Sequence, residues 1–452
     1  MTPRPFQWRD IFLHPAAAWT LGLVIVHQSV IAASSYFLTR LIEIFQAGGD
    51  FTPYLSAYLA AMLLPYLPGC ASLLTLQLWI NRAHRAFSEH LPESTYALTE
   101  HHRNIALRET IESVYSRNSF VALRDYLTFI HDFASLILNS ALSMLVLSLL
   151  LPGNLALGYT VSILAAAALI LLLRRSVHSL STRTEACFIA YSETLSHIWD
   201  NSVLGNQYNF DLWRSHRDEL ASRYYKCSNK LQLAKQGGNL ALAFISLTPT
   251  IYLMVGAVYS RTTEPALIAA VFVSLTRIFH ILNSLSALVY RLLDFTAVSA
   301  RIQVLMDAER SLTEPGRVPD TPCSSISING SPVHHYEPVV EAIRNSSKGR
   351  FTIRGANGSG KSTLLHVLKK ALSCDALLVP SHHGKLHWRS ASGTQSTGQR
   401  TVAQLMEIAS HPEARYLLLD EWDANLDASN KQVVDEMLEN LSKQRVVVEI
   451  RH

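Results

Sequence analysis

Nine consecutive residues carry the clearest chemical signal in the sequence. The stretch Gly355–Thr363 reads Gly-Ala-Asn-Gly-Ser-Gly-Lys-Ser-Thr and fits the phosphate-loop pattern, in which glycines precede a Lys-Ser pair. Glycines let backbone N–H groups turn inward around phosphate oxygens, Lys361 can reach the β- and γ-phosphates, and Ser362 can hold a magnesium ion. The candidate phosphate-binding residues are Gly355, Asn357, Gly358, Ser359, Gly360, Lys361, Ser362 and Thr363.

Two elements must position this loop. Phe351-Thr352-Ile353 predicts a short strand before it, and the Thr-Leu-Leu-His-Val-Leu run from Thr363 predicts a helix after it. The positive N-terminus of that helix would face a bound anion. The alternative, an ordinary Gly/Ser turn, does not account for the Gly-Lys-Ser-Thr ending in a strand–loop–helix context.

A second candidate element is an apolar strand that ends in two carboxylates. Tyr416-Leu-Leu-Leu leads directly into Asp420 and Glu421. Asp420 stands where a carboxylate could hold Mg²⁺ through water, and Glu421 could polarise the attacking water. The sequence therefore predicts ATP and Mg²⁺ as ligands, with Ser362 and Asp420 as the metal residues.

At this point the chain resembles the ATP-binding-cassette (ABC) transporter family. The segment from Trp422 to Asp427 is similar to the family's D-loop, and Gln395–Arg400 is similar to its signature sequence, with Thr397 where the first glycine is usual. Val446–His452 is similar to the strand that ends in the switch histidine. These motifs fall in the family's order, and the resemblance covers the whole chain.

The resemblance implies a role for each matching residue. Two chains would sandwich two ATP molecules, with Ser396, Gly398 and Gln399 of one chain closing the loop of the other. Glu421 and His452 would be catalytic, and Asp427 would line the nucleotide. Tyr336 could stack on adenine as the family's A-loop aromatic does; an ordinary surface tyrosine is an equally good interpretation.

Charge-free intervals outside the phosphate-loop region predict six membrane spans. They lie in the intervals 16–38, 50–82, 133–151, 154–173, 235–261 and 265–290. The loops 82–125 and 174–235 are long and rich in Arg and Lys, which favours a cytoplasmic side for them and for both termini. We therefore expect a multi-pass protein of a bacterial-like inner membrane, with the nucleotide-binding domain in the cytoplasm.

The expected fold class is an exporter-type membrane α-helical domain of six transmembrane helices, followed by a reduced α/β P-loop domain. The boundaries are 1–310 for the membrane domain, 311–322 for the linker and 323–452 for the nucleotide-binding domain. Only 59 positions separate Lys361 from Asp420, fewer than the family has, and no glutamine loop is recognisable. The formal net charge of +4 implies no nucleic-acid partner.

The expected function is that of a half-transporter, an ATP hydrolase coupled to export of an amphipathic peptide, a peptide-like metabolite or a lipid-like substrate. A second half, most simply an identical chain, would complete it. The alternative is an ATP-binding membrane regulator or degenerate subunit without productive transport. Glu193–Asn206 is either a coupling helix or a plain connection.

Three histidines, and a pair of polar residues in the sixth span, are weaker candidates for functional sites. His382, His383 and His387 suggest a metal site, but a solvated loop is the better interpretation. Arg277 and His280 share a helical face in the sixth span and would line a transport path, unless Arg277 extends to lipid head groups.

Overall fold

A computed structural model describes most of the chain. The described residues are 7–102, 104, 107–108, 111–112, 119–150, 153–259, 295, 298–299, 302–303, 306–307, 310, 312, 321–322, 325–381, 386–389, 397–410, 414–424 and 426–451. The chain forms two compact units. One comprises 4–91 and 113–308 and is helical; the other comprises 1–3, 92–112 and 309–452 and contains the sheet. The predicted sixth span, and with it Arg277 and His280, lies outside the described residues.

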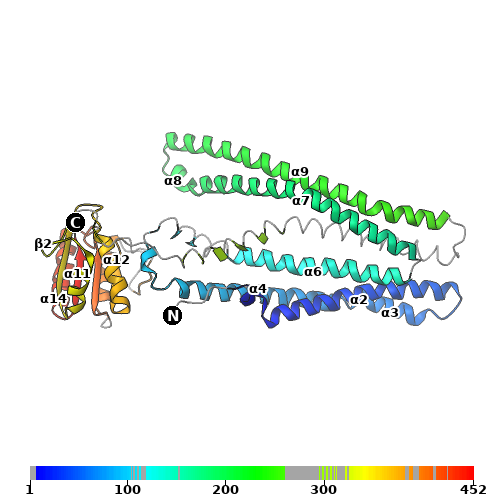
Figure 1. The fold of residues 1–452 in the computed structure, drawn as a ribbon, viewed down its shortest axis with the longest axis horizontal. Helices are drawn as coiled ribbons and strands as arrows, with labels where there is room; N and C mark the ends of the chain where they lie inside the picture. The colour runs from blue at the N-terminus through cyan, green and yellow to red at the C-terminus, as the bar shows by residue number, and fades with distance from the viewer. Residues whose placement is uncertain are drawn as a thin grey trace. The chain divides into compact units, whose positions relative to one another are not determined.

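The helical unit is built mainly from long helices that run side by side, together with shorter ones (Figure 1). They are α1 (Trp8–Phe12), α2 (Pro15–Gln46), α3 (Thr52–Leu63), α4 (Tyr66–Thr95, whose end enters the other unit), α6 (Ser119–Leu150), α7 (Gly153–Ser196), α8 (Ile198–Val203) and α9 (Gln207–Tyr259). The breaks follow the sequence: α3 and α4 are separated next to Pro65, and α6 and α7 are separated at the expected Leu-Pro-Gly stretch.

Small and hydroxylated side chains form the buried face of α2. The helix begins at Pro15, a residue suited to the first turn, and the His14 side chain caps it by accepting from the Ala16 N–H at 3.0 Å. The buried positions include Thr20, Ser35 and Thr39, and α2 packs along α3 and α6. Small residues at such interfaces allow helices to approach closely where water cannot drive their association.

The pair formed by α7 and α9 is an antiparallel hairpin that α8 closes. The Trp213 indole N–H donates to the Thr194 carbonyl at 2.8 Å and fixes the base of this turn. Helix α7 continues to Ser196 and α9 begins at Gln207, so the connection 174–235 consists of the ends of these two long helices on either side of α8, as the scarcity of Pro and Gly predicts.

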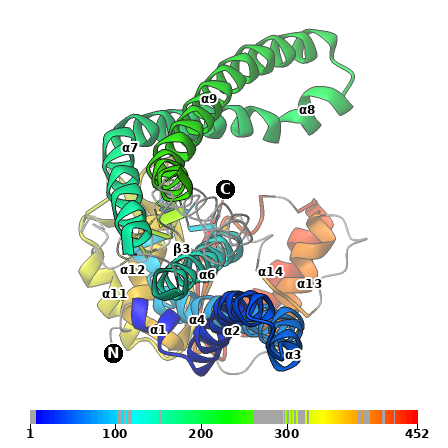
Figure 2. The same ribbon diagram turned by 90° about the vertical axis from the view of Figure 1, so that its right-hand side faces the viewer.

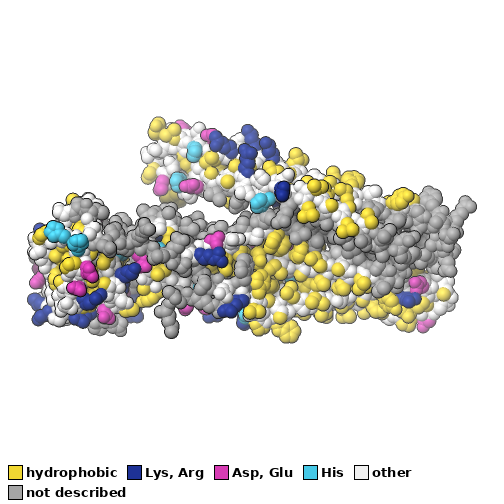
Figure 3. Space-filling model, in the orientation of Figure 1, with side chains coloured by type: hydrophobic (Ala, Val, Ile, Leu, Met, Phe, Trp, Pro, Cys, Tyr) yellow, Lys and Arg dark blue, Asp and Glu magenta, His cyan; other side chains and the backbone are white. Residues whose placement is uncertain are grey.

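Hydrophobic side chains gather on the surface over the helical unit (Figure 3). Two segments of the described part, Pro15–Gln46 and Thr52–Thr95, are long and apolar enough to cross a membrane. The count of six spans stays a prediction, because the described residues support only these two by length and composition.

The second unit carries a six-stranded sheet in the order β2-β1-β3-β6-β5-β4. Its strands are β1 (Ile326–Ile328), β2 (Ser331–Val333), β3 (Gly349–Gly355), β4 (Ala376–Val379), β5 (Tyr416–Asp420) and β6 (Val446–Ile450). Its helical elements are η1 (Thr99–His101), α11 (Tyr336–Asn345), α12 (Lys361–Leu372), η3 (Ser373–Asp375), α13 (Thr397–Ala409) and α14 (Ala428–Ser442). Strands β3, β6, β5 and β4 are parallel, and β1 pairs antiparallel with both β2 and β3.

Helices cover both faces of this sheet (Figure 2). Because side chains alternate along a strand, Leu418 of β5 packs with α11 and α12, whereas Leu417 and Leu419 pack with α13 and α14. This two-sided burial explains why β5 is apolar at four of its five positions. The carboxyl ends of the parallel strands come together at one edge, where ligands bind in open α/β sheets.

We expect mild oxidation to join Cys187 and Cys227. Their Sγ atoms lie 3.5 Å apart, on α7 and α9 respectively, so a small rotation of each side chain brings them to bonding distance. The hydrogen bond between the two thiols raises the pKa of Cys187, so the reaction with copper phenanthroline should quicken at alkaline pH. Mass spectrometry of tryptic peptides would detect the bridge.

Cys187→Ser removes the bridge, and Cys70→Ser serves as a control that leaves it intact. A wild-type protein that gave no linked peptide under these conditions would contradict the register of the α7–α9 hairpin.

Candidate functional site

The phosphate-loop residues form a tight turn between β3 and α12. Gly358 and Gly360 have φ of +79° and +103°, in the region that suits glycine. A Cβ on Gly355 would lie 2.8 Å from the Ser359 Oγ and 3.1 Å from the Ser325 carbonyl oxygen. The glycines are therefore required by the shape of the turn. Asn357 lies within the turn, and Thr363 lies in the first turn of α12.

Lys361 is almost fully buried, with 8% of its surface exposed. Its ammonium group donates to the Gly355 carbonyl at 2.8 Å and to the Ala356 carbonyl at 3.1 Å. These neutral partners hold the cation over the loop, and no described residue brings a carboxylate into contact with it. Phosphate oxygens approaching the loop would therefore meet a positive charge already in place.

Ser362 joins the loop to the end of β5. Its hydroxyl donates to the Asp420 Oδ1 at 3.1 Å, although β6 separates the two strands. One hydroxyl and one carboxylate at this distance are the hard oxygen ligands that Mg²⁺ takes together with phosphates and water. The donor set fits the magnesium ion that the sequence predicts.

Ser359 supplies a further indication of a ligand. Its side chain is 1% exposed, and its Oγ has no hydrogen-bond partner among the described residues. Buried hydroxyls are normally satisfied, and each exception requires an explanation. A phosphate oxygen bound in the loop is an explanation that the chemistry supports.

Glu421 follows Asp420 in a strained backbone conformation. Its φ is +49°, which is uncommon for a residue with a side chain. The Glu421 N–H donates to the Ile450 carbonyl at 3.1 Å and so ties the end of β5 to the end of β6. Strain of this kind clusters at functional sites.

Tyr336, the predicted A-loop aromatic, lies in the core of the sheet-containing unit. Its side chain is 2% exposed and packs in the core with α12, because it begins α11 against the sheet. The ring has no open face, and its hydroxyl donates to the Gly360 carbonyl at 3.2 Å. In this arrangement the tyrosine supports the phosphate loop from within the core.

The signature and D-loop residues are only partly described. Gly398 and Gln399 lie in the first turn of α13, whereas Ser396 and the switch residue His452 lie outside the described residues. Asp427 is the N-cap of α14 and accepts from the Asn430 N–H at 2.8 Å. That bond lowers the pKa of Asp427, so the carboxylate has a structural task that the sequence motif does not reveal.

A segment of the first long connection belongs to the same unit as the sheet. The Glu100 carboxylate lies 3.4 Å from the Lys370 Nζ, and the rings of His102 and His366 have centroids 5.0 Å apart. Both partners lie on α12, the helix that starts at the phosphate loop. Sequence reasoning missed this contact, because nothing in a local pattern pairs residues 270 positions apart.

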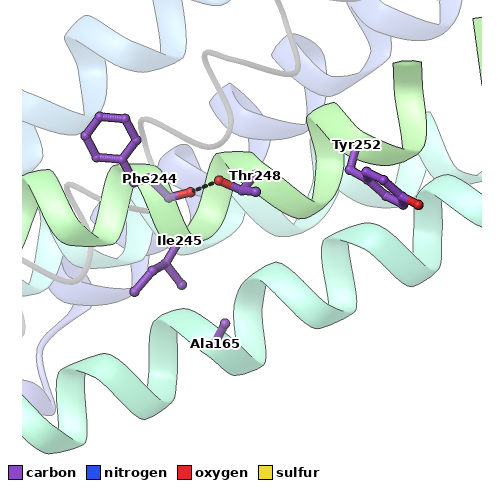
Figure 4. Close-up of a pocket in the computed structure, with 5 residues that line it drawn as sticks. All are labelled: Ala165, Phe244, Ile245, Thr248 and Tyr252. Atoms are coloured by element: carbon purple, nitrogen blue, oxygen red, sulfur yellow. Dashed lines mark hydrogen bonds between the residues drawn. The ribbon is translucent and has the colours of Figure 1, made fainter. Parts of the chain in front are cut away.

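An apolar pocket lies between α7 and α9 in the helical unit (Figure 4). Its volume is about 510 Å³, and its lining residues are Ala165, Phe244, Ile245, Thr248 and Tyr252. The Thr248 hydroxyl donates to the Phe244 carbonyl at 2.6 Å, so the lining offers mainly hydrocarbon.

Of the predicted histidine group, His387 is described, and His382 and His383 lie outside the described residues.

We expect Gly355→Ala to weaken binding of a nucleoside triphosphate. The added Cβ meets the Ser325 backbone, and overpacking of this kind costs about 1–3 kcal/mol, or about 5- to 150-fold in affinity if it falls on the bound loop. Titration with a fluorescent ATP analogue would measure the change. Gly237→Ala is the matched control, because no atom lies within 4 Å of a Cβ there.

Comparison with known proteins supports the architecture. No protein-family profile matches this sequence, and no curated protein sequence is detectably similar. Among solved structures, a bacterial Atm1-family ABC exporter with ATP bound is similar, with a TM-score of 0.61 and 14% sequence identity. The match covers 97% of this chain and 90% of that chain. This chain therefore has an ABC-exporter-like fold.

Proposed function

We propose that this chain is one half of an ATP-driven, exporter-type membrane transporter. The observation that carries the proposal is the contact between Ser362 and Asp420 at 3.1 Å beside the buried Lys361. These are the groups that a magnesium–triphosphate needs, and they meet at the end of a parallel sheet in a chain with an exporter-like fold.

Each residue of the loop has a task in binding. The backbone N–H groups of the Gly355–Thr363 turn surround the phosphates, and Lys361 exchanges its two carbonyl partners for phosphate oxygens. Ser362 and Asp420 would hold Mg²⁺, which neutralises charge on the β- and γ-phosphate oxygens.

Hydrolysis would require a general base and a group that orients the attacking water. Glu421 would accept the proton of the attacking water, in line with its position directly after Asp420. His452, two residues beyond the end of β6, would contact the γ-phosphate. Ser396, Gly398, Gln399 and Asp427 would act across a dimer, where one chain closes the site of the other.

A second half-transporter is the expected partner, most simply an identical chain. The turn formed by α8 exposes large apolar side chains, among them Trp199, Leu204 and Tyr208. Such side chains on a polar, extramembrane helix end mark a surface that binds another protein. The predicted coupling segment Glu193–Asn206 contains this turn, which supports its role as a contact with the partner's nucleotide-binding domain.

We assign coupling within one chain to the contact between η1 and α12. Nucleotide held at the start of α12 would act along this helix on His366 and Lys370, and through them on the segment Pro92–Glu112. The contact would replace the glutamine loop, for which the sequence has no recognisable counterpart.

The apolar pocket between α7 and α9 supports an amphipathic or lipid-like substrate. Its lining suits a hydrocarbon portion. The direction of transport is export by analogy with the fold.

A second candidate is an ATP-binding membrane regulator without productive transport. The specific observation in its favour is the short path from α12 to β5, in which the described residues contain only η3, β4 and α13. Basal ATPase activity of the purified chain separates the two, because a regulator of this kind hydrolyses almost no ATP.

We expect Glu421→Gln to abolish turnover and retain ATP binding. Loss of a general base lowers hydrolysis by about 10²- to 10⁴-fold, whereas the loop residues that hold phosphate remain. Phosphate release and binding of a fluorescent ATP analogue, both measured on the full chain in nanodiscs, report the two steps separately. Undiminished hydrolysis in this variant would exclude Glu421 as the base.

We expect Lys370→Glu to disconnect the segment Pro92–Glu112 from the nucleotide. In the Glu421→Gln background, ATP with Mg²⁺ should slow hydrogen exchange across this segment, and Lys370→Glu should remove that response without loss of nucleotide binding. Adding Glu100→Lys restores opposite charges and should restore the response.

Lys443→Glu is the control, since it reverses a charge at the C-cap of α14, whose side chain bonds to Asn440 of that helix. An unchanged exchange response in Lys370→Glu would rule out this route of coupling.

A further inference from the structure

Glu449 is a carboxylate inside the core of the sheet. It lies in the central strand β6 and is 0% exposed. Val447, two residues earlier on the same face of the strand, packs in an apolar cluster with α13 and α14. A buried carboxylate costs several kcal/mol unless it is paired and hydrogen-bonded, so its presence here calls for an explanation beyond packing.

Four side chains from three parts of the chain donate to this carboxylate. The Arg350 Nε and the Thr352 hydroxyl, both from β3, donate to Oε1 at 3.0 Å each. The Arg451 Nε donates to Oε1 at 2.9 Å, and the Trp422 indole N–H donates to Oε2 at 3.0 Å. Glu449 is therefore the common acceptor of the network.

Two of these donors are immediate neighbours of the proposed hydrolytic residues. Trp422 follows Glu421 in the sequence, and Arg451 precedes His452. The Arg451 guanidinium also lies over the Trp422 ring, 5.5 Å from its centroid. The backbone bond from Glu421 to Ile450 completes a closed connection between the ends of β5 and β6.

The backbone of Glu421 needs such a support. A side-chain-bearing residue at φ +49° keeps that conformation only where the surrounding structure fixes it. The Trp422 indole is held one residue away by Glu449, which prevents the turn after Asp420 from relaxing into an ordinary extended path.

On the other side of the network, two acidic side chains of α14 pair with the two arginines. Arg350 contacts Asp435 at 2.6 Å and Glu439 at 3.2 Å, and Arg451 also pairs with Asp435. Burial acts to lower the pKa of Arg350, but its bonds to Glu449, Asp435 and Glu439 raise the pKa above the ordinary value. Burial acts to raise the pKa of Asp435, and the two arginines lower it below the ordinary value. Arg350 and Asp435 therefore remain ionised at neutral pH.

We propose that Glu449 is a positioning residue of the ATP site, which holds Glu421 and the end of β6 in register through Trp422 and Arg451. This inference rests on the proposed function, because it assigns Glu449 to the hydrolytic step and not to nucleotide binding. The phosphate loop has its own supports, and no bond from Glu449 reaches it among the described residues.

Glu449→Gln tests the proposal in the full chain in nanodiscs. The amide has the same shape but turns one acceptor into a donor that faces Arg451 or Trp422. We expect kcat for ATP hydrolysis to fall about 10- to 100-fold, the usual effect of removing a supporting group behind a reactive residue. KM for ATP, and the affinity for a fluorescent ATP analogue, should change less than about threefold on the same grounds.

Glu439→Gln is the matched control. It removes the same charge from the same network, but its partner is the Arg350 NH1, and its carboxylate is exposed. We expect wild-type kcat in this variant. Trp422→Phe, which removes only the indole donor, should show the kcat effect in weaker form, and it provides a second test if Glu449→Gln does not fold.

The outcomes separate this inference from the function on which it rests. Wild-type kcat in Glu449→Gln or, if that variant does not fold, in Trp422→Phe overturns the inference alone. A parallel loss of kcat, nucleotide affinity and thermal stability also overturns it, because that pattern indicates a purely structural role. Absence of hydrolysis in the wild-type chain overturns the proposed function and the inference together.

Discussion

The hydrogen bond between Ser362 and Asp420 is the interaction on which the candidate site depends. Ser362 lies at the start of α12, in the loop–helix segment that follows β3, and Asp420 ends β5. The two strands are not neighbours, because β6 lies between them. Only a parallel arrangement with aligned register brings the loop, the carboxylate and the end of β6 to the same edge. A shift by one residue would turn Asp420 to the other face of the sheet and separate the pair.

The middle of the sheet combines two kinds of packing. On the face of α11 and α12 lies an apolar cluster, with Leu364, Leu368 and Val448 among its members. On the opposite face, the region beside β3 and β6 is charged and contains Arg350 and Glu449. Replacing such a cluster by apolar residues often costs nothing in stability, whereas hydrogen bonds in fixed directions specify one arrangement of the strand ends.

Sequence reasoning located the elements of the site better than the contacts around them. The glycine spacing predicted the position of the loop. Positive φ at Gly358 and Gly360, and the lack of space for a Cβ at Gly355, leave few alternatives to glycine at these positions. The position of Tyr336 could not be derived, since a tyrosine before an amphipathic helix suits a surface or a core equally well. The charge of Glu449 within Val-Val-Val-Glu-Ile is a signal that a local pattern could have raised, but its partners on β3 and directly after β5 come from distant segments.

The helical unit illustrates the same limit. Proline and glycine marked the breaks between helices, because they act on the local backbone. The helical course of the connection 174–235 on either side of its turn followed from its composition, which has no proline and a single glycine, Gly205. The contact of Glu100 with Lys370 depends on tertiary structure and leaves no trace in composition.

The length of α9 has a mechanical consequence. Its 53 residues correspond to roughly 80 Å at the usual rise per residue, whereas the hydrocarbon core of a bilayer is about 30 Å thick. The membrane span predicted within α9 would take up only that thickness, so a large part of the rod would extend past it, with α7 beside it as a brace. With a free arm of about 50 Å, a tilt of about 10° displaces the far end by roughly 9 Å. The α7–α9 hairpin can thus act as a lever, in which a modest rotation at one end produces a large displacement of the other.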